Sequence, residues 1–75
     1  MNKQDFIKNL KLQFEEEEMS NINFNTVFRD LDTWDSLTKF SVIAFVEDDY
    51  GLKIDDFSKI ETVKQLFEII LLKKP

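Results

Sequence analysis

The sequence contains no cysteine and no histidine. Without cysteine, the chain has neither a disulfide framework nor a thiolate that could act as a nucleophile or as a metal ligand. Without histidine, it lacks the commonest general base and the commonest ligand of transition metals. A Ser-His-Asp or Cys-His site cannot be built from this chain alone, and the sequence carries no phosphate-binding loop and no metal motif. We therefore expect no catalytic residues, no metal site and no enzymatic activity.

Residues that break helices are almost absent as well. The chain has one glycine, Gly51, and one proline, Pro75. A sheet of many strands needs frequent turn residues, so this composition favours helices. Long apolar runs are also missing. The largely polar first ten residues have no apolar core of a signal peptide, and no run approaches the ~20 residues needed to span a bilayer. We expect a cytoplasmic protein without a signal peptide and without insertion into a membrane.

Positive charge is scarce, with 10 Lys and Arg against 15 Asp and Glu and a net charge of −5. Such a surface disfavours nucleic acid and anionic membranes as partners and favours partners with basic patches. Apolar side chains are plentiful: 43% of the 75 residues are hydrophobic, and eight are phenylalanine. This is enough for one small domain, residues 1–75, with its own core. Nothing in the sequence calls for an oligomer, so we expect a monomer.

Hydrophobic periodicity predicts an all-α fold, a small bundle of three main helices plus a short third helix, with a long first loop. The first helix is expected over about residues 2–17, with Asn2 as its cap. Its end carries four glutamates, residues 15–18. We interpret them as a solvated helix end, because they lack the spaced pattern of a calcium loop. The connection over residues 19–35 is too apolar for a flexible loop, and we expect it to pack onto the helices.

The later helices carry clearer boundary signals. The second main helix is predicted over residues 36–50, with Asp35 or Ser36 as its N-cap and Gly51 just past its end. A short helix is expected to begin at residue 55 or 56. Thr62 then caps the last helix, whose apolar side chains recur at helical spacing.

Ser36 opens the second main helix within the string "LDTWDSLTKF". A helix N-terminus presents free N–H groups and a positive dipole end, so a phosphate attached there would be stabilised. The neighbouring base is the carboxylate of Asp35, which is too weak to activate a serine. Ser36 is therefore not expected to be a catalytic nucleophile. If it is used chemically, another protein modifies it.

A helix turns by about 100° per residue, which assigns the residues of this helix to two opposite sides. One side carries Leu37, Ser41, Ala44 and Asp48. The opposite side carries Val42, Ile43, Val46 and Tyr50. Two interpretations are open. Either the first side is a mildly apolar strip with an acidic end that suits a basic partner, or both sides are buried.

The tripeptide Asp35-Ser36-Leu37, opening the helix "LTKFSVIAFVEDDYG", resembles the acyl carrier protein family. Length, acidity, the long apolar loop and the order of helices fit as well, over about residues 5–71. The resemblance implies a 4′-phosphopantetheine arm on Ser36, installed by a phosphopantetheinyl transferase from coenzyme A. The arm holds an acyl group as a thioester and carries it between enzymes. The further partners would be acyl ligases, synthases or acyltransferases of fatty acid or specialised acyl-chain biosynthesis.

The resemblance also implies roles for single residues. Partner recognition would fall to Asp35, Leu37, Ala44, Glu47 and Asp48. Some family members shelter the acyl chain between the second, third and fourth helices. The candidate lining residues here are Phe40, Ile43, Ile60 and Val63.

The sequence departs from the family pattern just before the serine. Asp32 and Thr33 stand where the family usually has a glycine, and Trp34 replaces a generally smaller residue. These departures favour a dedicated pathway over the general fatty acid synthase. Two alternatives stay open: an aminoacyl or peptidyl carrier of the D-alanyl or peptidyl type, and a helical interaction module without an arm. For Trp34, packing over the loop and contact with a partner are both open.

Overall fold

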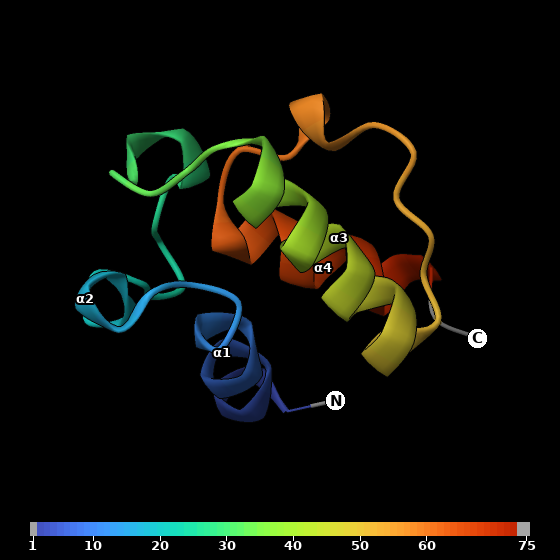
Figure 1. Cartoon of the computed structure of the whole chain (residues 1–75). Coiled ribbons are helices and arrows are strands. Elements are labelled where there is room, and N and C mark those ends of the chain that lie inside the picture. Colours follow the sequence, from blue (N-terminus) through green and yellow to red (C-terminus); the bar gives the residue numbers. More distant parts are fainter. Residues whose placement is uncertain (1, 74–75) are drawn as a thin grey trace.

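The computed structural model describes residues 2–73 of the chain. Its helices are α1 (Lys3–Lys11), α2 (Glu16–Met19), η1 (Phe28–Asp30), α3 (Ser36–Tyr50), η2 (Phe57–Lys59) and α4 (Val63–Lys73), where η denotes a 3-10 helix. Residues 2–73 contain no strand, and one isolated antiparallel bridge pairs Val27 with Thr62. The predicted all-α fold is confirmed, with α1, α3 and α4 as its three main helices (Figure 1).

The prediction of one first helix over residues 2–17 is wrong. Asn2 caps α1 as expected, but α1 ends at Lys11 and a turn separates it from α2. Glu15 is extended there, with φ −66° and ψ 152°. The break has an electrostatic reason. A continuous helix would end on four carboxylates, whereas the break moves three of them to the first turn of α2, at the positive end of its dipole.

The predicted boundaries of α3 and the predicted cap of α4 are confirmed, whereas the short helix begins at Phe57 instead of residue 55 or 56, with Asp56 as its N-cap. α3 spans residues 36–50 with Asp35 as its N-cap, and Gly51 follows it in the left-handed conformation, at φ 71°. The N–H of Gly51 donates to the Glu47 carbonyl at 3.0 Å, which closes the last turn. The hydroxyl of Thr62 accepts from the Gln65 N–H at 3.1 Å and caps α4. The Gln65 side chain accepts in return from the Thr62 N–H, which completes a capping box.

The connection before α3 packs against the helices, as predicted. Ile22, Phe28 and Leu31 are buried in it, and Phe28 begins η1. Backbone hydrogen bonds fasten the connection to the start of α4: Phe28 donates to Glu61 at 2.9 Å, and Val63 donates to Thr26 at 3.0 Å. This segment, far from α4 in sequence, is therefore part of the framework on which α3 begins.

The centre of the core is an aromatic cluster that joins the three main helices. Phe6 of α1 is completely buried, and its ring lies 6.1 Å from that of Phe45 on α3 and 5.3 Å from that of Phe67 on α4. We call Phe6, Phe24, Phe45, Tyr50 and Phe67 the Phe6 cluster. In Figure 1, α1 lies beneath α3 and α4, which is the arrangement these contacts require. None of the helices in residues 2–73 is long and apolar enough to cross a membrane.

Candidate functional site

Ser36 is the first residue of α3, and its side chain is exposed. Asp35 is the cap: its carboxylate accepts from the Thr38 N–H at 2.8 Å. The N–H and hydroxyl of Thr38 hold the pKa of the Asp35 carboxyl below its ordinary value. Within residues 2–73, the Ser36 hydroxyl takes part in no hydrogen bond. The capping task thus falls to Asp35, and the Ser36 oxygen stays open to solvent.

Glu18 fixes the chain that leads into Ser36. It is only 4% exposed, and its carboxylate accepts from the Asn21 amide at 2.7 Å and from the Thr33 N–H at 3.1 Å. The Thr33 hydroxyl donates to the same carboxylate at 3.2 Å. The Asn21 amide, followed by the Thr33 N–H, lowers the Glu18 pKa, although burial opposes this shift. The interpretation of residues 15–18 as a wholly solvated helix end is therefore wrong for Glu18.

Thr33 connects Glu18 to the first turn of α3 by hydrogen bonds. Its carbonyl accepts from the Thr38 hydroxyl at 3.0 Å, so Thr38 is held by Thr33 and by Asp35. Glu18 therefore reaches the first turn of α3 through Thr33 and Thr38. Sequence reasoning missed this connection, because Glu18 and Thr33 are 15 residues apart and no local pattern relates them.

Trp34 packs against the core. Its ring stacks on Phe28 at a centroid distance of 4.9 Å and lies 6.2 Å from the ring of Phe14 and 5.5 Å from that of Phe57. We call Phe14, Phe28, Trp34 and Phe57 the Trp34 cluster. Of the two interpretations of Trp34, packing over the loop agrees with these contacts. The side chain is only partly buried, so one edge of the cluster remains open.

The outer face of α3 is exposed along its whole length. Leu37 is 77% exposed and Phe40 is 61% exposed. The other exposed side chains are those of Ser36, Ser41, Ala44, Glu47, Asp48 and Asp49. Val42, Phe45 and Val46 are buried on the inner face. Of the two interpretations of this helix, the one with both sides buried is wrong, and the apolar strip with an acidic end is present.

Three of the four candidate lining residues share one core, because Ile43 packs against the cluster that contains Ile60 and Val63. Ile60 and Val63 are buried and Ile43 is half-buried, but the Phe40 side chain lies at the surface. Phe40 follows Leu37 by three residues and precedes Ala44 by four, so helical geometry assigns it to their face. The expectation that Phe40 points into the interior is thus corrected, and Phe40 becomes part of the exposed strip of α3.

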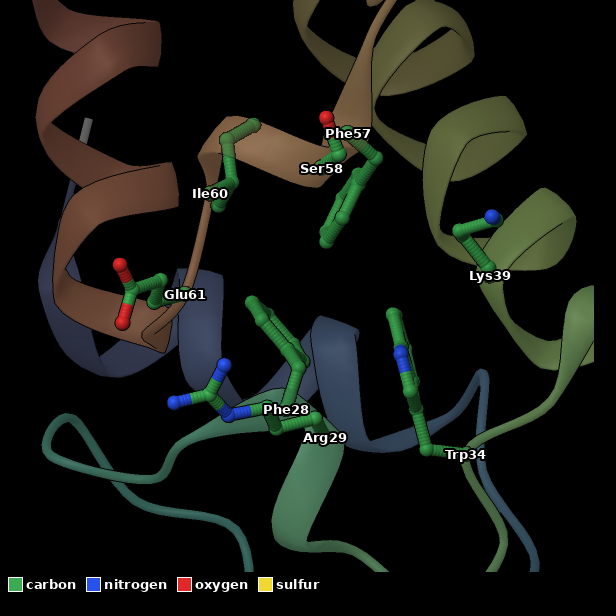
Figure 2. A pocket seen from close by; sticks show the side chains of 8 residues that line it. All are labelled: Phe28, Arg29, Trp34, Lys39, Phe57, Ser58, Ile60 and Glu61. Carbon is green, nitrogen blue, oxygen red and sulfur yellow. The ribbon is translucent and has the colours of Figure 1, made fainter.

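A cavity of about 170 Å³ lies beside the start of α3. Figure 2 shows Phe28, Trp34 and Phe57 converging on it from three different segments, with Lys39 of α3 at one side and Arg29 and Glu61 at another. Ser58 and Ile60 complete its lining. Ile60 is the one candidate lining residue from the sequence that borders it. Trp34 precedes Ser36 by two residues and Lys39 follows it by three, but Ser36 itself does not line the cavity.

Comparison with known proteins adds no assignment. No protein family, no curated protein and no solved structure gives a significant match to the chain. Within residues 2–73, no group of three or more acidic side chains is arranged to hold a metal ion. The candidate functional site therefore comprises Ser36, the outer face of α3 and the cavity lined by Trp34 and Lys39.

Proposed function

We propose that this chain is a carrier of acyl groups, which are bound as thioesters to a 4′-phosphopantetheine arm on Ser36. It would shuttle them between partner enzymes of fatty acid or specialised acyl-chain biosynthesis. The observation that carries the proposal is the exposed hydroxyl of Ser36, without a hydrogen bond in the described residues, on the first residue of a 15-residue helix. The resemblance of Asp35-Ser36-Leu37 to the acyl carrier motif supports the same function.

The residues around Ser36 fit a phosphodiester. The first turn of α3 offers the positive end of the helix dipole, and the dipole of a 15-residue helix is well developed. Asp35 contributes a negative charge, but its carboxylate is directed to the Thr38 N–H as a cap. Lys39 stands one turn further along and supplies a positive charge. The first turn is thus held in shape by Asp35 and Thr38 without using the Ser36 oxygen.

The attachment reaction balances with coenzyme A as the donor. The Ser36 oxygen forms the new bond to phosphorus, the pyrophosphate bond of coenzyme A breaks, and adenosine 3′,5′-bisphosphate leaves. The hydroxyl proton goes to the transferase, because this chain has no histidine or cysteine to accept it. The arm then supplies the thiol that forms the thioester. The chain itself presents the serine, holds the helix and offers a docking face.

The docking face would be the exposed strip of α3. Leu37, Phe40 and Ala44 supply apolar area, and Glu47 and Asp48 supply negative charge at the far end of the helix. A partner with an apolar patch and a basic rim complements this sequence of side chains. Such rim charges act mainly on the association rate and on its salt dependence.

The proposal is tested by intact mass spectrometry after incubation with coenzyme A and a phosphopantetheinyl transferase of broad specificity. The wild-type chain is expected to gain the mass of one phosphopantetheine, and Ser36→Ala is expected to gain nothing. Ser41→Ala is the matched control, because Ser41 is also an exposed serine of α3. Folded wild type that remains unmodified with several transferases would contradict the proposal.

The exposed strip of α3 also favours a second candidate, a helical interaction module without an arm. The two candidates are separated by the same mass measurement, since an interaction module gains no mass. The kind of cargo is decided next. The modified chain is offered carboxylic acids and amino acids with ligases from the same source, and loading by amino acids alone would replace the acyl carrier by an aminoacyl carrier.

A further inference from the structure

We infer that the cavity beside Ser36 receives the acyl group and that it selects a compact one, about the size of a single aromatic ring, with a neutral or acidic substituent. This inference rests on the proposed carrier function, and it adds the class of cargo. Three independent features of the cavity carry it: volume, aromatic walls and the charges at the rim.

The volume of the cavity limits the size of the acyl group that it can hold. The cavity measures about 170 Å³, close to the ~150 Å³ of an engineered protein cavity that binds benzene. A long fatty chain does not fit such a volume and would leave most of its methylene groups in water. Because burial of apolar area is the main gain on binding such a group, only a cargo that fits inside is retained well.

The aromatic side chains that line the cavity favour an acyl group of planar shape. The rings of Phe28 and Phe57 meet edge to face at a centroid distance of 5.3 Å, and Trp34 stacks on Phe28. A planar ring can add to this group by the offset and edge contacts that aromatic pairs prefer. Phe28 and Phe57 are almost fully buried, and Trp34 is partly open. The group therefore enters past Trp34, the wall nearest to Ser36 in the chain.

The charged residues at the rim of the cavity determine which charge on the acyl group is favoured. Arg29 and Lys39 are cationic, and Glu61 is the one acidic side chain that lines the cavity. Within residues 2–73, Arg29 forms no ion pair. The rim is thus more positive than negative, although the chain as a whole carries a net charge of −5. A carboxylate or hydroxyl on the ring is favoured there, and an ammonium group is disfavoured.

A second hollow, between the segment after α3 and α4, is larger, at about 340 Å³. It is lined by residues from Leu52 onward, and no aromatic side chain is among them. None of its lining residues flanks Ser36 in the chain. The smaller cavity is therefore the one whose lining combines aromatic side chains with residues close to Ser36 in the chain.

Trp34 is the only tryptophan in the chain, so its fluorescence reports on this cavity directly. The first test uses the unmodified protein and S-benzoyl-N-acetylcysteamine, a free mimic of a loaded arm. We expect a saturable change in Trp34 emission, and no such change with the S-acetyl analogue. A 4-carboxybenzoyl probe is expected to bind more tightly than a 4-(aminomethyl)benzoyl probe. No response to the benzoyl probe overturns the inference, and the reverse charge order overturns its charge component.

Matched variants locate the response. Phe57→Leu widens the cavity and is expected to weaken the benzoyl probe severalfold. Phe45→Leu changes a side chain of the same type and the same 6% exposure, but Phe45 belongs to the Phe6 cluster and does not line the cavity. It is expected to leave the probe affinity unchanged. Circular dichroism checks that both variants are folded, and equal weakening by both would overturn the inference.

The second test uses chains that carry acetyl-, benzoyl- or dodecanoyl-phosphopantetheine on Ser36. A tether holds the acyl group at an effective concentration in the millimolar range. The benzoyl form is expected to show the largest change in Trp34 emission and the highest melting temperature. An equal or larger effect of dodecanoyl overturns the inference. If no transferase modifies the chain, the carrier proposal fails, and the free-probe titration still decides whether the cavity binds a ring.

Discussion

The Phe6 cluster and the Trp34 cluster contain similar side chains, but they are built from different elements. The Phe6 cluster connects α1, α3 and α4, the three longest helices, and its Phe6 ring is completely buried. The Trp34 cluster is built from η1, η2, the turn between α1 and α2 and the connection that leads into α3, and its Trp34 ring is partly open. The cavity lies against the Trp34 cluster alone. One cluster thus holds the helices together, while three members of the other, Phe28, Trp34 and Phe57, line the cavity.

From this comparison we expect a division between a cluster that mainly sets stability and a cluster that lines the cavity. Regions with fewer buried contacts and shorter elements open at lower free-energy cost than the centre of a core. A carrier needs a stable helix to present Ser36 and an adaptable wall beside it. The following changes either weaken this division or define it more sharply.

The largest loss of stability is expected for Phe6→Ala. Phe6 touches Phe45, Tyr50 and Phe67, and its removal leaves a cavity between the main helices. Truncation of a buried phenylalanine costs about 3–5 kcal/mol, a large part of the stability of a small domain. Urea unfolding followed by circular dichroism measures this loss. A cost below that of Trp34→Ala would contradict the division between the two clusters.

A smaller loss is expected for Trp34→Ala. The ring packs on Phe14, Phe28 and Phe57 but is already partly open, so we expect a loss of about 1–3 kcal/mol. Modification of Ser36 by a transferase should survive, because Asp35 and Thr38 hold the first turn of α3 independently. Unfolding curves and intact mass are measured on the same sample. Unchanged stability with slower transfer to a partner would instead make Trp34 a partner contact.

Glu18→Gln is expected to destabilise the chain in a pH-dependent way. The folded pKa of Glu18 is lowered from 4.5, so its contribution is complete above pH 4.5 and is lost as the pH falls through the folded pKa. At neutral pH, the variant replaces a carboxylate that accepts from Thr33 by an amide with one acceptor oxygen.

The difference in melting temperature between wild type and Glu18→Gln, measured from pH 7 to pH 3, tests this contribution. It should be largest at neutral pH and should shrink below pH 4.5. Asp35 and Asp56 also have lowered pKa values, but they are present in both proteins and cancel in the difference. A difference that stays constant or grows toward acid pH would show that the Glu18 carboxylate does not fasten Thr33.

The smallest effect on stability is expected for Phe40→Ala. The Phe40 side chain is 61% exposed, so its removal should change the free energy of unfolding by no more than about 0.5 kcal/mol. The modification rate by a transferase should fall, since the strip of α3 loses its largest apolar side chain. Phe45→Ala, on the inner face of the same helix, should behave in the opposite way. A normal rate for Phe40→Ala would remove Phe40 from the docking face.

The sequence was sufficient where the structural signals are local. Asp35 and Gly51 mark both ends of α3, and Thr62 with Gln65 marks the start of α4, because caps act within one turn. The break between α1 and α2 carries no glycine or proline. Its local signal is the run of four glutamates, which was interpreted as the end of one helix instead of the start of a second.

The parts of the candidate site that were missed depend on distant contacts. The Glu18 carboxylate meets Thr33 across 15 residues, and the cavity is assembled from η1, α3 and η2. Phe40 was assigned to the interior from the resemblance to the acyl carrier family. Its spacing from Leu37 and Ala44 places it on the outer face of α3, where it is 61% exposed.

The most direct test of the account is to locate the modification by fragmentation mass spectrometry of the chain after treatment with coenzyme A and a transferase. We predict one phosphopantetheine, on Ser36, in the wild type and in Ser41→Ala. A group found on Ser41 or Ser58 instead, or a folded chain that several transferases leave unmodified, would contradict the claim that Ser36 is the attachment point of a carrier.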